Sequence, residues 1–174
     1  MAKSKTSIFT LTEEVKLPTS GSLVQATIPI GSLIDVGDAQ ALEIVSVDYI
    51  VQQYDNGYVP YRMLFTTQGA ISCQLLDKNE SEFISAADNN LISSMSMQQD
   101  ASNLTSHFAD FYPDDFKGDT GRFVVNDEMY VLAKAGGTYT TDQSARVTIR
   151  IRAKVVKLST RDWMAISLET VQNE

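Results

Sequence analysis

Residues 145–158 read Ala-Arg-Val-Thr-Ile-Arg-Ile-Arg-Ala-Lys-Val-Val-Lys-Leu. Apolar and polar side chains alternate along this stretch, and a period of two is typical of a β-strand that buries one face. The apolar side holds Val147, Ile149, Ile151, Ala153 and Val155, and the polar side holds Thr148, Arg150, Arg152 and Lys154. We therefore predict a long strand that pairs within its own sheet or with a neighbouring subunit.

Basic charge is concentrated in the same part of the chain. Six basic residues occur in this region with no acidic residue between them: Arg146, Arg150, Arg152, Lys154, Lys157 and Arg161. Residues 1–144 contain 8 basic and 19 acidic side chains, and the whole chain carries a net charge of −8 with a pI near 4.6. Proteins that wrap polyanions usually present a broad basic face, so the composition argues against such a role for the body of the domain.

Three surroundings would accommodate the basic strand. It could face acidic neighbours in its own sheet and form cross-strand ion pairs. It could instead meet an acidic surface of an identical subunit, or line an interior that faces nucleic acid, because Arg and Lys neutralise phosphates. The candidate subunit-interface or nucleic-acid-facing residues are Arg146, Arg150, Arg152, Lys154 and Lys157.

Length and composition fit one globular domain. A chain of 174 residues with 43% apolar side chains is long enough to bury a sizeable core. No stretch approaches the 18 apolar residues of a membrane span, and the basic start lacks the apolar region of a secretory signal. The single cysteine, Cys73, excludes an intrachain disulfide framework, and its alternating surroundings predict a small buried hydrophobe.

Alternating segments separated by turn residues predict an all-β fold, an eight-stranded sandwich or jelly roll. Asn56-Gly57 is the strongest hairpin signal, because this pair tolerates the positive φ angles of a tight turn, and we expect a β-meander around it. We expect a short polar arm (1–6), the sandwich domain (7–158) with long loops in its second half, and a C-terminal helix or tail (159–174). The predicted strands span 7–16, 23–30, 41–54, 59–67, 71–76, 92–98, 122–132 and 145–158.

The C-terminal segment begins with a helix-capping pattern. Ser159-Thr160-Arg161-Asp162 resembles a capping box, in which a Ser side chain accepts a hydrogen bond from a backbone N–H of the first turn. We predict a short amphipathic helix in which Met164, Leu168 and Val171 share a face.

The sequence contains no catalytic motif. Its only histidine, His107, lies among Ser, Ala and Asp with no sequence-adjacent partner, which favours a histidine of a loop or core over a general base. There is no Gly-rich phosphate loop and no metal-ligand spacing of His and Cys. We therefore expect a protein that is not an enzyme and has no small-molecule substrate.

The loop at 108–119 is acidic and aromatic. Asp110, Asp114, Asp115 and Asp119 could together offer oxygen ligands to Ca²⁺ at subunit contacts, although their spacing matches no EF-hand. A solvated acidic loop is the alternative. The aromatic residues between them predict that the loop is anchored within the domain or against a neighbour.

In outline the chain resembles the single jelly-roll capsid proteins of small icosahedral viruses. The resemblance rests on about eight strands, a hairpin-rich first half, a long loop in the second half and a strand at 147–158 that ends the roll before a short tail. It implies a coat protein of a virion that self-assembles from many identical subunits. Capsid proteins of this kind often carry a strongly basic N-terminal arm, whereas only Lys3 and Lys5 precede the first strand here. This departure argues against direct genome binding and leaves the expected shell formation unaffected.

Two other functions remain open at this stage. A phage decoration protein, tail protein or filament subunit would share the sandwich fold and differ in particle shape. A carbohydrate-binding module would use surface aromatics, but the single Trp163 falls in the predicted helix and the tyrosines are scattered.

Overall fold

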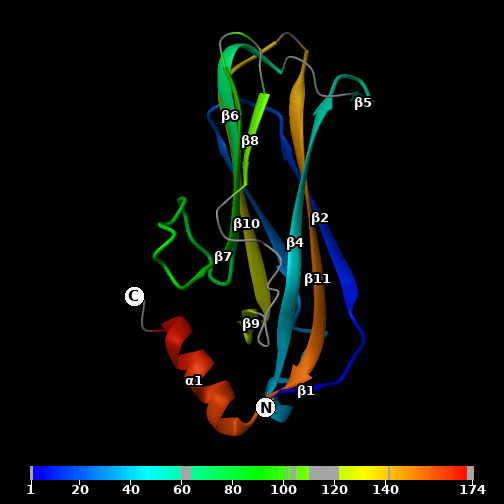
Figure 1. Cartoon of the computed structure of the whole chain (residues 1–174), viewed down its shortest axis with the longest axis vertical. Helices are drawn as coiled ribbons and strands as arrows, with labels where there is room; N and C mark the ends of the chain where they lie inside the picture. Colours follow the sequence, from blue (N-terminus) through cyan, green and yellow to red (C-terminus); the bar gives the residue numbers. More distant parts are fainter. Residues whose placement is uncertain are drawn as a thin grey trace.

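The computed structural model describes residues 2–59, 64–100, 102, 105–109, 122–140 and 142–171. Two antiparallel sheets stack face to face along the length of the molecule (Figure 1). The β11 sheet consists of β1 (Lys3–Ser4), β2 (Phe9–Leu17), β4 (Gln40–Tyr54), β5 (Tyr58–Val59), β9 (Arg122–Val124) and β11 (Ser144–Lys157). The β10 sheet consists of β3 (Leu23–Pro29), β6 (Phe65–Leu76), β7 (Leu91–Gln99), β8 (Thr105–Ala109) and β10 (Glu128–Tyr139).

The order of strand pairing identifies the fold as a jelly roll. Four antiparallel pairs, β2 with β11, β3 with β10, β4 with β9 and β6 with β7, match strands from the start of the chain to strands from its end. The chain therefore behaves as one long hairpin whose two arms pair in order. The additional pairs β4–β11 and β6–β10 close this hairpin into a two-layered roll. The predicted all-β jelly-roll class is confirmed.

The core lies between the sheets and explains the alternation in sequence. Val147, Ile149 and Ile151 of β11 are fully buried, and they face residues of the other sheet such as Ile71 and Val131. Phe65 is one of the largest fully buried side chains, and its ring stacks on that of Tyr139 at a centroid distance of 5.5 Å. Burying a large apolar side chain contributes about 1.5–3 kcal/mol, so the inward faces of the long strands dominate stability.

The described residues form nine strands of three or more residues and two strands of two residues, whereas we predicted eight. The predicted meander is wrong, because β6 pairs with β10 and β7 in the other sheet and not with β4. The predicted strands 59–67 and 71–76 were divided at Gly69, but β6 runs through this glycine without a break. The predicted strand 122–132 is instead two strands in different sheets, β9 and β10, separated at residues 125–127.

Both ends of the described chain carry regular structure. In the expected polar arm, Lys3 and Ser4 form β1 and pair with the end of β11. The C-terminal helix is confirmed as α1 (Thr160–Val171), and its first turn is capped as predicted, because Asp162 N–H donates to Ser159 Oγ at 3.1 Å. A short 3₁₀ turn, η1 (Val36–Asp38), lies between β3 and β4.

Helix α1 buries a different face from the predicted one. Trp163 and Ile166 pack against a second apolar cluster of Ala41, Val125, Val156 and Leu158. Met164 and Leu168, the residues expected to share a face, are 55% and 58% exposed. The helix thus covers the end of the β11 sheet where β11 stops (Figure 1), and it leaves apolar side chains in solvent.

Candidate functional site

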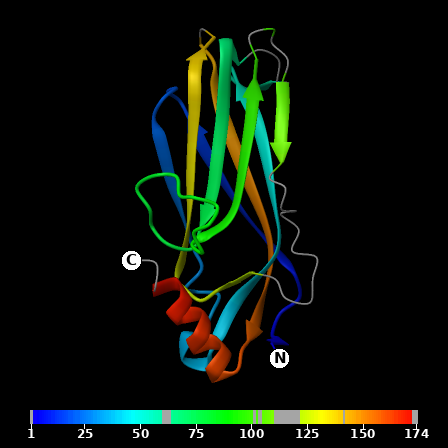
Figure 2. The ribbon, with the colours of Figure 1, turned by 60° about the vertical axis from the view of Figure 1, so that its left-hand side comes forward.

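The basic strand β11 occupies the centre of its sheet. It pairs with β4 on one side and with β2 and β1 on the other (Figure 2 gives a second view of the long strands). Because its apolar residues fill the core, the outer face of β11 carries Arg146, Thr148, Arg150, Arg152 and Lys154. The structure therefore aligns four of the five predicted basic residues along one surface of the domain, and Lys157 falls on the opposite side of the strand.

Two of the five predicted residues form ion pairs within their own subunit. Lys154 Nζ lies 3.0 Å from Glu43 Oε1 on the neighbouring strand β4. Lys157 pairs with Asp38, the last residue of η1, and Lys5 lies 3.7 Å from the same carboxylate. The hydrogen bond from Lys157 holds the pKa of Asp38 below its usual value, assisted by one from Gln40.

Arg146 makes a different kind of contact. Its guanidinium carbon lies 4.4 Å from the centroid of the Tyr54 ring, which is a cation–π geometry. Tyr58 packs edge-on against Tyr54 at 5.5 Å and donates a hydrogen bond to Glu14. This hydrogen bond raises the pKa of the Tyr58 hydroxyl.

Arg150 and Arg152 are exposed and make no ion pair with any described residue. Arg150 lies opposite Asp48 on β4 and Thr12 on β2, and Arg152 lies opposite Ser46 and Thr10. Register alone places Arg150 beside an acid, but no contact within 4.0 Å joins the two side chains. Within the described part of the chain, these two guanidinium groups therefore have unused hydrogen-bonding capacity.

Sequence reasoning did not single out the exposed apolar residues near this surface. Ile50 lies opposite Thr148 on the outer face and is 38% exposed, and Tyr58 is 55% exposed at the β4–β5 turn. The signal for Ile50 was present in the alternation of β4, because Val47, Tyr49 and Val51 occupy the inward face.

The remaining predicted site residues are not brought together by the described structure. Asp110, Asp114, Asp115 and Asp119 lie outside the described residues, so the calcium site stays a prediction. Within the described ranges no three His, Cys, Asp or Glu side chains gather as a metal site would require. His107 lies on β8 opposite Met97. Cys73 is fully buried as expected, and burial raises the pKa of its thiol.

A buried polar cluster joins β9 to the loop between β6 and β7. Asp77 is 1% exposed, and its Oδ1 accepts a hydrogen bond from Asn126 Nδ2 at 2.9 Å. Its Oδ2 has no hydrogen-bond partner and lies 3.6 Å from Arg122 Nη2. Burial raises the pKa of Asp77, against the opposing effects of Arg122 and Asn126. The cluster thus links β9, the segment after β6 and the segment between β9 and β10 through Asp77.

No family model and no curated protein matches the chain. Solved structures similar to it include Trichodysplasia spinulosa-associated polyomavirus VP1 in complex with 3'-sialyllactose, at 12% identity over 90% of this chain and 98% of that chain, with a TM-score of 0.45. The same VP1 in complex with GM1 oligosaccharide gives 12% identity, 90% and 96% coverage and a TM-score of 0.43. A structure of Desmodium yellow mottle tymovirus gives 11% identity, 88% and 90% coverage and a TM-score of 0.29.

These likenesses concern the fold alone. The jelly-roll architecture that the predicted resemblance implied is shown by the strand pairing of this chain itself. Among the described residues, no helix has both the length and the apolar character needed to cross a membrane.

Proposed function

We propose that the protein is a structural, non-enzymatic subunit that self-assembles into a shell of the viral capsid type, located in the virion. The observation that carries this proposal is the pair Arg150 and Arg152, which are exposed on the outer face of β11 and have no ion-pair partner among the described residues. Lys154 and Lys157 serve as the internal comparison, because both have an acidic partner in their own subunit.

An identical subunit is a suitable partner for these arginines. The chain has 22 acidic and 14 basic side chains, so a second copy carries a net negative charge that attracts a basic row. A basic surface that meets an acidic surface elsewhere makes a head-to-tail contact. Contacts of this type close into rings and shells or continue into filaments, depending on the rotation between subunits.

Exposed apolar side chains add a second contribution to such a contact. Ile50 lies on the same outer face as the arginines, and Met164 and Leu168 project from α1. Interface cores are enriched in aromatic residues, Met and Arg, and depleted of Lys, Glu and Asp. Arg150 and Arg152 with Ile50 therefore form the surface that we assign to subunit contact.

Sedimentation velocity with negative-stain microscopy tests the proposal. We expect the wild-type protein to form uniform, closed particles that sediment rapidly. Arg150→Glu with Arg152→Glu is expected to leave a folded species near 19 kDa, because the substitution places acidic groups against an acidic partner. The matched control, Lys3→Glu with Lys134→Glu, makes the same charge change at exposed positions away from this surface and should still assemble.

The outcomes separate the alternatives. A double arginine variant that assembles like the wild type would show that the arginines do not cross an interface. Wild-type filaments would favour a tail or fibre subunit, and a wild-type monomer would contradict self-assembly.

A nucleic-acid-facing role is the second candidate, and the same two arginines favour it. Exposed guanidinium groups neutralise phosphates, and binding would weaken steeply with salt. In that case purified particles would carry nucleic acid, and the double arginine variant would form empty particles of unchanged size.

A further inference from the structure

A shallow groove of about 500 Å³ lies on the outer face of the β10 sheet. It crosses β6, β7 and β10 near the end of the sandwich that lies away from α1 (Figure 1). Small residues make its floor: Ala70 on β6 and Gly136 and Gly137 on β10. Ala70 and Gly136 face outward because Ile71 and Ala135 beside them are fully buried in the core.

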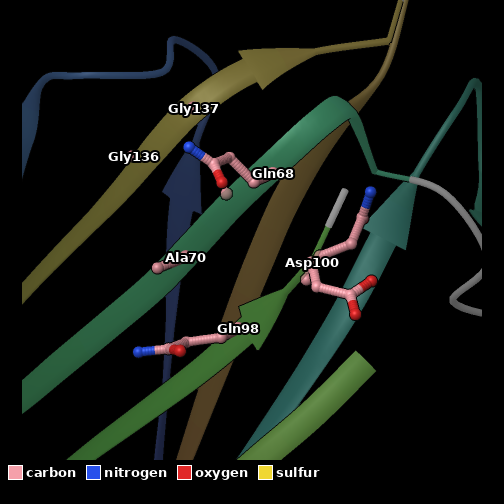
Figure 3. A pocket seen from close by; sticks show the side chains of 8 residues that line it. Gln68, Ala70, Gln98, Asp100, Gly136 and Gly137 are labelled. Atoms are coloured by element: carbon pink, nitrogen blue, oxygen red, sulfur yellow. The ribbon is translucent and has the colours of Figure 1, made fainter. Parts of the chain in front are cut away.

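The rim of the groove offers uncommitted carboxamides. Gln68 and Gln98 are exposed and make no hydrogen bond with a described residue, and Asp100 lies just past the end of β7 (Figure 3). Each carboxamide has two N–H donors and one carbonyl acceptor. By contrast, Gln99 is 2% exposed and binds the backbone of Phe65 and Thr67, so it shapes the groove without facing a ligand.

The lining excludes several ligand classes. Among the described lining residues there is no cationic side chain, and Asp100 would repel an anion such as a phosphate. The described part of the lining also lacks a large apolar side chain to hold a hydrophobic ligand. An extended peptide cannot add to β6 as a further strand, because β6 is already paired on both sides, with β10 and β7.

We propose that this groove binds a neutral oligosaccharide of two or three sugar rings. Sugar hydroxyls are both donors and acceptors, which is the complement of carboxamides that offer both on one rim. The flat floor of glycine and alanine admits the C–H face of a ring close to the backbone, since glycine within a strand often marks the close approach of a ligand. A volume of about 500 Å³ lies within the range of small-molecule sites.

Saturation-transfer NMR on the full chain tests the site with maltotriose, cellotriose and chitotriose as neutral probes and trigalacturonic acid as an anionic probe. We expect signal from at least one neutral trisaccharide and none from the anionic one. Gly136→Val places a branched side chain on the floor, and we expect the fold to accept it because a Cβ at Gly136 meets no atom within 4 Å. We expect Gly136→Val and Gln98→Ala each to weaken binding at least about tenfold, which corresponds to the loss of one or two hydrogen bonds or contacts.

Thr27→Val is the matched control, since Thr27 is exposed on the same face of the sheet but outside the groove. It should bind like the wild type. The proposal is overturned if no neutral trisaccharide gives signal, if both groove variants bind like the wild type, or if the anionic probe is preferred. The result is independent of the proposed shell function, because sugar binding is read from ligand resonances and assembly is read from sedimentation.

Discussion

At the scale of single residues, Asp77 is the clearest case of a group held in an unfavourable environment. Its carboxylate is 1% exposed, and the nearest guanidinium nitrogen, Arg122 Nη2, stays 3.6 Å away, beyond hydrogen-bond distance. Burial therefore outweighs pairing, and the pKa of Asp77 lies above its usual value in the folded protein. The folded state binds this proton more tightly than the unfolded state.

The raised pKa of Asp77 has a definite consequence for stability. Its contribution favours folding most below the unfolded pKa of about 3.9 and is lost as the pH rises through the higher folded value. We therefore expect Asp77→Asn to gain stability relative to the wild type as the pH rises through this window. Urea unfolding of both proteins at several pH values measures the difference in their free energies of unfolding. The titration of other groups cancels in this difference. A difference that does not change with pH would contradict the assignment.

Several properties of single residues could be predicted from the sequence. The burial of Cys73 and the cap at Ser159 followed from local pattern, because alternation and capping depend on near neighbours in the chain. The partners of the basic residues could not be predicted. Lys154 and Lys157 form ion pairs with acidic side chains of the same chain, whereas Arg150 forms none with a described residue. Which pairs form depends on side-chain geometry across strands.

At the scale of elements, Gly69 shows why a strand was misread as two. A Cβ at Gly69 would lie 2.3–2.6 Å from ring atoms of Phe65, so this glycine makes room for a buried ring and does not mark a turn. In the sequence the two roles look alike, because a glycine within a strand pattern signals either a break or a close approach. Helix α1 was predicted correctly as an element, but the choice of Trp163 and Ile166 as its buried face depends on the second apolar cluster.

Two glycines on adjacent strands give a matched test of this reading. Gly69→Ala should destabilise the fold by about 1–3 kcal/mol, because the Phe65 ring is stacked on Tyr139 and cannot move freely. Gly136→Ala, where the Cβ meets no atom within 4 Å, should be neutral or stabilising by up to about 1 kcal/mol. The midpoints of urea unfolding, at an unchanged slope, measure both effects. Equal midpoints for the two variants would show that β6 accommodates the methyl group by moving Phe65.

At the scale of the whole molecule, the pairing order of the strands was the part that the sequence could not supply. Each strand was recognisable because it buries one face, but the assignment of β4 and β6 to different sheets depends on long-range pairing that leaves no local pattern. The charge distribution was predictable, because the sequence already concentrates the basic residues in β11. The sheet then places this strand between β4 and β2.

This separation of charge predicts how assembly responds to salt. If exposed Arg150 and Arg152 meet an acidic surface of a second copy, raising NaCl from 0.05 M to 1 M should shift the protein from particles toward subunits, because the screening length falls to about 3 Å at 1 M. Sedimentation velocity across this range measures the shift. Contacts made chiefly by Met164, Leu168 and Ile50 would respond in the opposite sense or not at all, since apolar burial does not weaken with screening. Particles that persist at 1 M salt would therefore assign the subunit contact to these apolar residues and not to the basic strand.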